Sequence, residues 1–213
     1  MRRFFQQAFI VITVIAGLMV SVAAAQQTIH GTLSGSLGPG EYIVDGDIQV
    51  LAGQSLTIQP GSHFMHAGHF TWIINGQFNA DGVENNPITF TRQFPYEAHK
   101  WGGFRFSENS SNQSSIQWCE IEYCKNISYP NSLGGAIFLD RVGFPIRNCK
   151  ITECQAEDGG AIYANYSPAG LMIEDCYVAN NNSSNGAGIY LESCAIGVAV
   201  KGCVIKDNIS TGT

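Results

Sequence analysis

Charged residues are scarce in this 213-residue sequence, and basic residues are the scarcer kind. Only 13% of the residues are charged, and 17 acidic residues outnumber 11 basic ones. The basic residues are scattered, so no stretch is suited to a phosphate backbone, and nucleic acid is not expected as a partner. The low charge does not indicate disorder, because 45% of the residues are hydrophobic, enough for one sizeable core.

Helical periodicity and zinc-binding spacing are both missing. After residue 25 no segment keeps an apolar period of 3.6 residues, so amphipathic helices are not predicted. The seven cysteines include no Cys-x-x-Cys pair, the spacing that marks many zinc sites, and we expect no zinc. Glycine, by contrast, is frequent at 24 residues, and much of it falls in a repeated motif.

Residues 1–25 have the features of a secretory signal peptide. Two arginines precede an apolar run from Ala8 to Val20, and a triplet of alanines ends at Ala25. Small residues at that point suit signal peptidase, although an uncleaved membrane anchor has a similar pattern. We therefore expect a mature chain of residues 26–213 that is secreted or held at the cell surface, where disulfide bonds are chemically possible.

A repeat of about 27 residues organises the second half of the chain. In each copy a short β-type run carries a cysteine, followed two residues later by Ile or Val, and another run begins with Gly-Gly-Ala-Ile or a variant of it. The cysteines are spaced 30, 27 and 27 residues apart. The cysteine copies contain Cys119, Cys149, Cys176 and Cys203; the glycine copies begin at Gly134, Gly159 and Gly186, with Trp101–Phe106 as a divergent first copy.

Alternation within each run predicts which side chains face a core. Cys149 and Ile151 share one face of a strand, while Lys150 and Thr152 point the other way. A unit of two short strands cannot bury its apolar face alone, whereas stacked copies form a continuous core. The sequence therefore predicts an all-β fold, a right-handed parallel β-helix solenoid of about six or seven coils.

The repeats resemble those of known surface proteins. From about residue 28 onward the chain is similar to secreted right-handed parallel β-helix proteins of the pectin-lyase-like fold. Its glycine motif, with Val178-x-x-Asn181 and Ile205-x-x-Asn208 downstream, is similar to the GGA(I/L/V) and FxxN repeats of polymorphic outer-membrane proteins, with Ile or Val in place of Phe. The resemblance implies a cell-surface or outer-membrane location, but the fold carries lyases, hydrolases, adhesins and passenger domains alike.

The repeat pattern reaches the end of the sequence without a visible cap. After Cys203 the next Gly-Gly is expected near position 213, where the sequence ends. Because solenoids carry a capping unit at each end, we expect the β-helix of residues 26–213 to be truncated at its C-terminus. Membrane attachment is expected only through that missing region.

Equivalent positions of stacked coils form ladders, and two of these are expected to be structural. We interpret the first as buried free thiols, with disulfides and a metal as alternatives, because in-register parallel neighbours suit the disulfide torsion poorly. The second lies at the strand exit, where stacked amides can bond to one another and to the backbone. The first ladder contains Cys119, Cys149, Cys176 and Cys203, and the second contains Cys124, Cys154, Asn181 and Asn208.

An acidic ladder is the candidate for ligand binding. Glu108, Asp140, Asn165 and Glu192 each follow the first glycine of a motif copy by six residues. On adjacent coils Glu108 and Asp140 would lie about 5 Å apart, which suits a retaining glycosidase pair or a shared calcium ion. The alternative is that these acids are ordinary turn residues. No matching ladder of Arg or Lys is visible beside them, and no cofactor other than calcium is expected.

Aromatic and histidine side chains each leave two interpretations open. Phe106, Phe138, Tyr163 and Tyr190 form a further ladder, which would be a stacking platform for sugars if exposed and core packing if buried. Arg105 stands where the other copies have Ile, which favours the inward orientation of the aromatic rings. His63, His66 and His69 recur every three residues, and a strand would place the middle one opposite the other two. A shared metal ion would therefore need a turn between them, for which Gly68 is suited, and the alternative is that they are surface or half-buried residues.

Two classes of function fit these patterns. The first is a non-catalytic secreted or surface module: an adhesin, a passenger stalk or a glycan-binding scaffold. The second is a polysaccharide lyase or glycoside hydrolase that acts on extracellular polysaccharide. The lack of a convergent charged cluster favours the module, with an extracellular polysaccharide or a host or cell-surface receptor as partner. Whether the chain is an enzyme stays open at this point.

Overall fold

The computed structural model describes residues 26–128 and 130–212. The expected signal peptide, residues 1–25, lies outside this range. The described residues form 24 β-strands and one short 3-10 helix, η1 (Glu97–His99). The predicted all-β fold is therefore confirmed. Within the described ranges no helix has the length and apolar character needed to cross a membrane.

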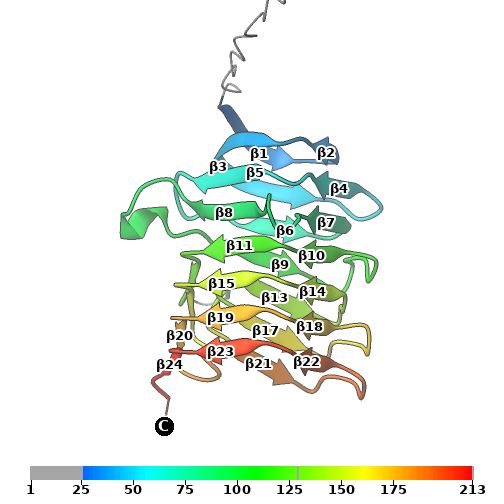
Figure 1. Ribbon diagram of the computed structural model, residues 1–213, viewed down its shortest axis with the longest axis vertical. Coiled ribbons are helices and arrows are strands. Elements are labelled where there is room, and N and C mark those ends of the chain that lie inside the picture. Colours follow the sequence, from blue (N-terminus) through cyan, green and yellow to red (C-terminus); the bar gives the residue numbers. More distant parts are fainter. Residues whose placement is uncertain (1–25, 129, 213) are drawn as a thin grey trace, which may run out of the picture.

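The largest sheet has two wings that share the long strand β3 (Gly40–Val50) (Figure 1). The first half of β3 pairs with β5 and the second half with β6. The strand β1 (Gln27–Thr32) also pairs with β3. The first wing contains β5 (Ser62–His66), β8 (Ile88–Arg92), β11 (Cys119–Glu122), β15 (Lys150–Thr152), β19 (Tyr177–Ala179) and β23 (Val204–Lys206). The second wing contains β6 (Trp72–Ile74), β9 (Phe104–Phe106), β13 (Ile137–Asp140), β17 (Ile162–Asn165) and β21 (Ile189–Glu192).

Two further sheets close the solenoid, and the pairings between strands are parallel throughout. Ile116 pairs with Ile146, which pairs with Ile173, so one coil corresponds to one sequence repeat. The seven strands of the second sheet agree with the predicted number of coils. That sheet contains β2 (Gly35–Leu37), β4 (Ser55–Ile58), β7 (Gln77–Asp81), β10 (Ser115–Gln117), β14 (Pro145–Arg147), β18 (Met172–Glu174) and β22 (Ala199–Lys201); the third contains β12 (Lys125–Asn126), β16 (Gln155–Ala156), β20 (Asn182–Ser183) and β24 (Ile209–Ser210).

The core runs along the axis and changes composition on the way. In the N-terminal coils it is aromatic: the ring of Phe64 stacks between Tyr42 and Phe90, at centroid distances of 4.8 and 4.9 Å. In the C-terminal coils Ile, Val and Cys replace the aromatic residues. Each fully buried large apolar side chain contributes about 1.5–3 kcal/mol, so the stack of inward residues is the main source of stability.

The Gly-Gly-Ala-Ile motif marks a corner where neighbouring coils approach closely. Gly134 has a φ of +61°, a conformation that L side chains rarely adopt. A Cβ atom on the second glycine, Gly135, would lie 2.0 Å from the carbonyl oxygen of Gly160 on the next coil. The motif therefore requires glycine for two separate reasons, backbone conformation at its first position and contact between coils at its second.

Candidate functional site

The outer face of the second wing carries two parallel rows of side chains. In β13, Ile137 and Leu139 point into the core, while Phe138 and Asp140 are half-buried on the outside. The strand register continues both positions along the axis. The first row contains Phe138, Tyr163 and Tyr190; the second contains Asp140, Asn165 and Glu192.

The aromatic row differs from the sequence prediction. Phe106 pairs with Leu139 and is fully buried, whereas Arg105 pairs with Phe138 and heads the outer row. The cause is a slip of one residue in the divergent copy, where Phe104, and not Arg105, pairs with Ile137. Such a slip exchanges the two faces of a strand. The predicted inward orientation is therefore confirmed for Phe106 and wrong for Phe138, Tyr163 and Tyr190, although Tyr163 is buried between its two neighbours in the outer row.

The rings of this row stack on one another. The Phe138 and Tyr163 centroids lie 5.8 Å apart, the Tyr163 and Tyr190 centroids lie 5.3 Å apart, and both pairs are nearly parallel. The Arg105 guanidinium carbon lies 5.8 Å from the Phe138 centroid. Because neighbouring rings cover each other's flat faces and Tyr163 is buried between the other two, the row offers a ligand the ring edges of Phe138 and Tyr190 and the Tyr190 hydroxyl instead of open stacking surfaces.

The acidic row is linked by hydrogen bonds. The Asn165 amide donates to Asp140 Oδ1 at 3.3 Å, and the Tyr163 hydroxyl donates to Glu192 Oε2. Burial and the neighbouring Glu192 carboxylate raise the pKa of Tyr163 far above its usual range. The Asn165 Oδ1 atom is buried and has no hydrogen-bond partner in the structure. Asp140 and Glu192 thus share one row, as predicted for them, with the buried Asn165 Oδ1 between them.

Glu108 does not occupy the position predicted for it in the acidic row. Because Phe106 pairs with Leu139, Ser107 follows opposite Asp140 and Glu108 falls one residue beyond the row. Arg141 Nη1 lies 3.4 Å from Glu108 Oε2 and 3.2 Å from Asp140 Oδ2. A single arginine, and not a ladder of basic residues, therefore accompanies these two acids. A guanidinium held by both carboxylates offsets their charge and occupies the position that a shared cation would take.

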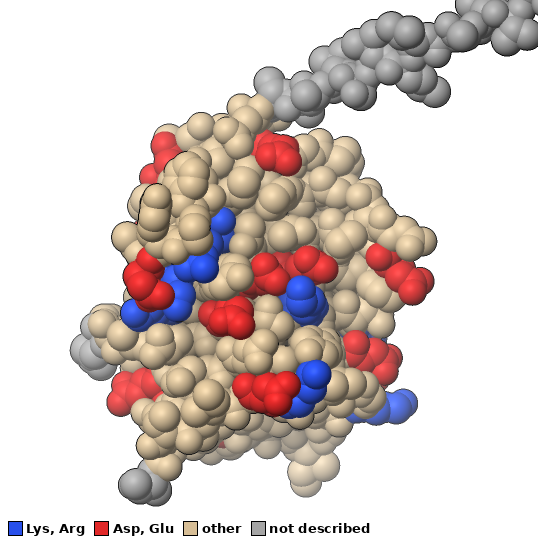
Figure 2. Space-filling view, turned by 60° about the vertical axis from the view of Figure 1, so that its left-hand side comes forward, with Lys and Arg blue, Asp and Glu red and all other residues tan. Residues whose placement is uncertain are grey.

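Other charged side chains on the surface also pair with opposite charges. Figure 2 shows basic and acidic side chains mixed on one face of the molecule, without a large patch of either sign. Glu97 contacts Lys100 at 3.0 Å and Lys125 at 3.2 Å, and Arg147 contacts Glu174 at 2.6 Å. Within the described ranges, no group of three His, Cys, Asp or Glu side chains is arranged to hold a metal ion.

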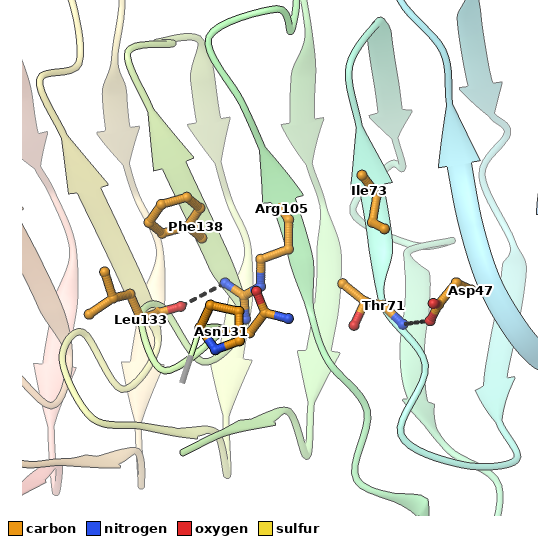
Figure 3. A pocket seen from close by; sticks show the side chains of 8 residues that line it. Asp47, Thr71, Ile73, Arg105, Asn131, Leu133 and Phe138 are labelled. Carbon is orange, nitrogen blue, oxygen red and sulfur yellow. Dashed lines mark hydrogen bonds between the residues drawn. The ribbon is translucent and has the colours of Figure 1, made fainter. Parts of the chain in front are cut away.

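A hollow of about 290 Å³ opens on the same outer face, toward the N-terminal coils. Ile73 and Arg105, register neighbours on β6 and β9, lie on its floor (Figure 3). Asp47 and Thr71 lie at one end, where the Thr71 backbone N–H donates to Asp47 Oδ1 at 2.9 Å. The remaining lining residues are Pro130, Asn131, Leu133 and Phe138.

Arg105 is the functional candidate that sequence reasoning missed. Its Nη1 donates to the carbonyl oxygens of Leu133 and Gly134 at 2.7 and 2.6 Å, and its Nη2 donates to that of Gly102 at 2.8 Å. Burial lowers the pKa of Arg105 to about 10, so it stays charged at neutral pH. Among the described residues no carboxylate lies within ion-pair distance of it. The only sequence signal is an arginine between two core aromatic residues of a strand.

Comparison with known protein families agrees with this architecture. The family model for a right handed beta helix region matches residues 74–213. The chain belongs to this right-handed β-helix family. Searches of curated proteins and of solved structures returned no match. The matched residues of this β-helix include β9, β13, β17 and β21, and thus most of the candidate face.

The cysteine ladder lies inside the β-helix. Cys119, Cys149 and Cys176 are buried, Cys203 is half-buried, and all are free thiols. The Cys149 sulfur contacts the carbonyl oxygens of Arg147 at 3.1 Å and Ile116 at 3.6 Å. Burial raises the pKa of Cys149, which disfavours the thiolate form at neutral pH.

Under denaturing conditions without reductant, we expect an alkylating reagent to modify Cys149, Cys176 and Cys203, because none is bridged. In the native protein Cys149 and Cys176 should stay unmodified, since both are buried. Mass spectrometry of the two samples measures this directly. Recovery of all three residues in native disulfides would contradict the interpretation.

The second ladder holds the backbone of successive coils of the β-helix together. Asn181 Oδ1 accepts the Cys154 backbone N–H at 2.9 Å, and Asn208 Oδ1 accepts that of Asn181 at 3.0 Å. The Asn181 amide also donates to the Ile151 carbonyl at 3.1 Å. Cys124 and Cys154 are fully buried at the equivalent position of earlier coils. These contacts give the ladder a structural role.

Proposed function

We propose that this β-helix is a non-catalytic secreted or cell-surface module that binds an extracellular glycan along the outer face of its second wing. The row of Asp140, Asn165 and Glu192 is the observation on which the proposal depends. It repeats hydrogen-bonding groups once per coil, about every 4.8 Å, and suits a hydroxyl-rich chain that lies along the axis. The Asn165 amide donates to Asp140 Oδ1 and so fixes that carboxylate in position for a ligand hydroxyl.

The contacts of the acids support binding over catalysis. A glycosidase needs one carboxylic acid and one carboxylate free on opposite sides of the scissile bond. Here Arg141 holds Glu108 and Asp140 together, and Tyr163 donates to Glu192. Groups held in this way serve better as fixed hydrogen-bond partners than as proton carriers.

Export and surface display complete the proposal. They rest on the basic and apolar pattern of residues 1–25 and on the resemblance of the glycine motif to that of polymorphic outer-membrane proteins. An adhesin or a passenger stalk is compatible with the same face, with a host or cell-surface glycan as its receptor.

Replacing Asp140 with Ala should weaken glycan binding by about tenfold, the worth of one charged hydrogen bond to a ligand hydroxyl. Calorimetric titration with a panel of neutral and acidic oligosaccharides, with and without calcium, measures the effect. Glu120→Ala is the matched control, because Glu120 lies on β11 of the first wing. Equal affinities of the wild type and Asp140→Ala for every glycan that binds would contradict the proposed face.

The alternative activity is that of a polysaccharide lyase or glycoside hydrolase. The observation that favours this alternative is that Glu108 and Asp140 lie close together, because both contact Arg141 Nη1. Release of new reducing ends or unsaturated products from the same panel, abolished by Asp140→Asn, would establish an enzyme. Binding without any product would support the module.

A further inference from the structure

We propose that the hollow between Asp47 and Arg105 binds a sugar acid, with the ligand carboxylate on Arg105 and its hydroxyl groups toward Asp47 and Asn131. The inference rests on the proposed glycan-binding function and names one chemical class of ligand for it. The class follows from three features of the hollow: a cation without a carboxylate partner, hydrogen-bonding groups at its edge, and the apolar side chain of Ile73 beside the cation.

The cation defines one end of the ligand. Arg105 carries five N–H groups, and its three hydrogen bonds to backbone carbonyls leave two of them unused. Its Nε atom is buried and has no partner in the structure. A buried charge normally pairs with an opposite charge, and a guanidinium binds a carboxylate best. Phe138 beside it excludes water from one side and strengthens that attraction.

The other groups define the rest of the ligand. Asp47 is exposed and uses one oxygen for the Thr71 N–H, so its second oxygen can accept from a hydroxyl. The Asn131 side chain is exposed on the wall of the hollow (Figure 3). Ile73 between them suits the C–H face of a sugar ring. A dicarboxylate would be repelled by Asp47, and a fatty acid would leave Asp47 and Asn131 without partners.

The size of the hollow limits how much ligand enters it. About 290 Å³ is just below the range of ligand pockets, roughly 300–1,000 Å³. One acidic sugar unit therefore occupies it, as a chain end or a branch. The hollow and the row of Asp140 share the outer face of the second wing, so a longer glycan can reach from one to the other.

Titration of the full chain with D-glucuronate and with D-glucose tests the proposal. EDTA is included so that calcium cannot bridge the carboxylate to an acid of the protein. We expect glucuronate to bind at least about tenfold more tightly than glucose, because only glucuronate pairs with Arg105. Arg105→Gln should remove this preference, and Arg92→Gln, which removes an arginine that stacks on Tyr123, should leave it unchanged.

Arg105 also holds the backbone near Gly134, so its replacement could disturb the fold. Asn131→Ala avoids this, because the Asn131 side chain is exposed. It should weaken glucuronate binding several-fold without changing the thermal unfolding temperature. In NMR spectra the Ile73 methyl and Asn131 amide signals should shift with glucuronate. Equal affinity for the two sugars, or unchanged binding in Asn131→Ala, would overturn the proposal.

The two functional proposals fail separately. If oligosaccharides bind with a dependence on Asp140 but glucuronate shows no preference, only the sugar-acid site is wrong. If no glycan binds at all, the glycan-binding face itself is wrong.

Discussion

Acidification from pH 7 to about pH 3 is expected to destabilise this protein steeply through one side chain, His66. The imidazole is fully buried and stacks on Trp101 at 4.0 Å. Its Nδ1–H donates to the Thr91 carbonyl at 2.8 Å, and its Nε2 accepts the Trp72 indole N–H at 3.0 Å. Protonation would place a second N–H against the Trp72 donor, at a fully buried position.

Burial lowers the pKa of His66 to about 3, against about 6.5 in the unfolded chain. Between these values the unfolded state binds the proton and the folded state does not. The free energy of unfolding therefore rises with pH in this window. The contribution of His66 is complete above about pH 6.5 and is lost as the pH falls toward 3, at up to about 1.4 kcal/mol per pH unit.

Urea unfolding at half-unit pH steps measures how steeply the free energy of unfolding changes with pH. The difference in slope between the wild type and His66→Gln separates the contribution of His66 from that of the carboxylates. In His66→Gln the amide oxygen can still accept the Trp72 N–H, and the slope between pH 6 and 4 should flatten. The control is His63→Gln, because His63 lies on the same strand but on its outer side. An unchanged slope in His66→Gln would show that His66 is protonated in the folded state.

Replacing Gly135 with Ala is expected to lower the free energy of unfolding by about 3 kcal/mol or more. The new Cβ would lie 2.0 Å from the Gly160 carbonyl oxygen, so two coils would have to move apart. Their parallel hydrogen bonds and the core contacts beneath them would weaken together. Chemical denaturation monitored by circular dichroism measures the loss.

Gly38→Ala is the matched control for this prediction. A Cβ at Gly38 would meet only the end of the Gln59 side chain, at 3.9 Å, so its cost should stay within about 1 kcal/mol. Gly160→Ala should resemble Gly135→Ala, since its Cβ would lie 2.4 Å from the Ala187 carbonyl oxygen. A loss below about 1 kcal/mol for both motif glycines would mean that the coils are not packed this closely.

Strand alternation and the repeat predict the fold because both depend on local sequence. Cys149 and Ile151 face inward together because side chains alternate along a strand. The 27-residue spacing places each copy above the next because one coil uses one repeat. Asp140 and Glu192 share a row for the same reason. Wherever copies of the motif align without ambiguity, the sequence is sufficient to predict which residues stack.

Where the repeat is irregular, only the tertiary structure determined which residues lie on the outer face of the second wing. In the divergent copy around Gly102, a slip of one residue buries Phe106, turns Arg105 to the outer face and moves Glu108 out of the acidic row. Periodicity cannot determine such a register, because one residue exchanges the two faces of a strand and only packing against the next coil selects between them.

The sequence by itself determined the parallel β-helix, its period and the inward residues of the regular coils. Only the three-dimensional structure showed that Arg141 contacts Glu108 and that Asp47 and Arg105 line the same hollow. These contacts join residues of different coils through their outward side chains. Outward positions carry no periodic hydrophobic signal, because water accepts almost any polar residue there, so their partners follow from the register of the coils and not from the motif.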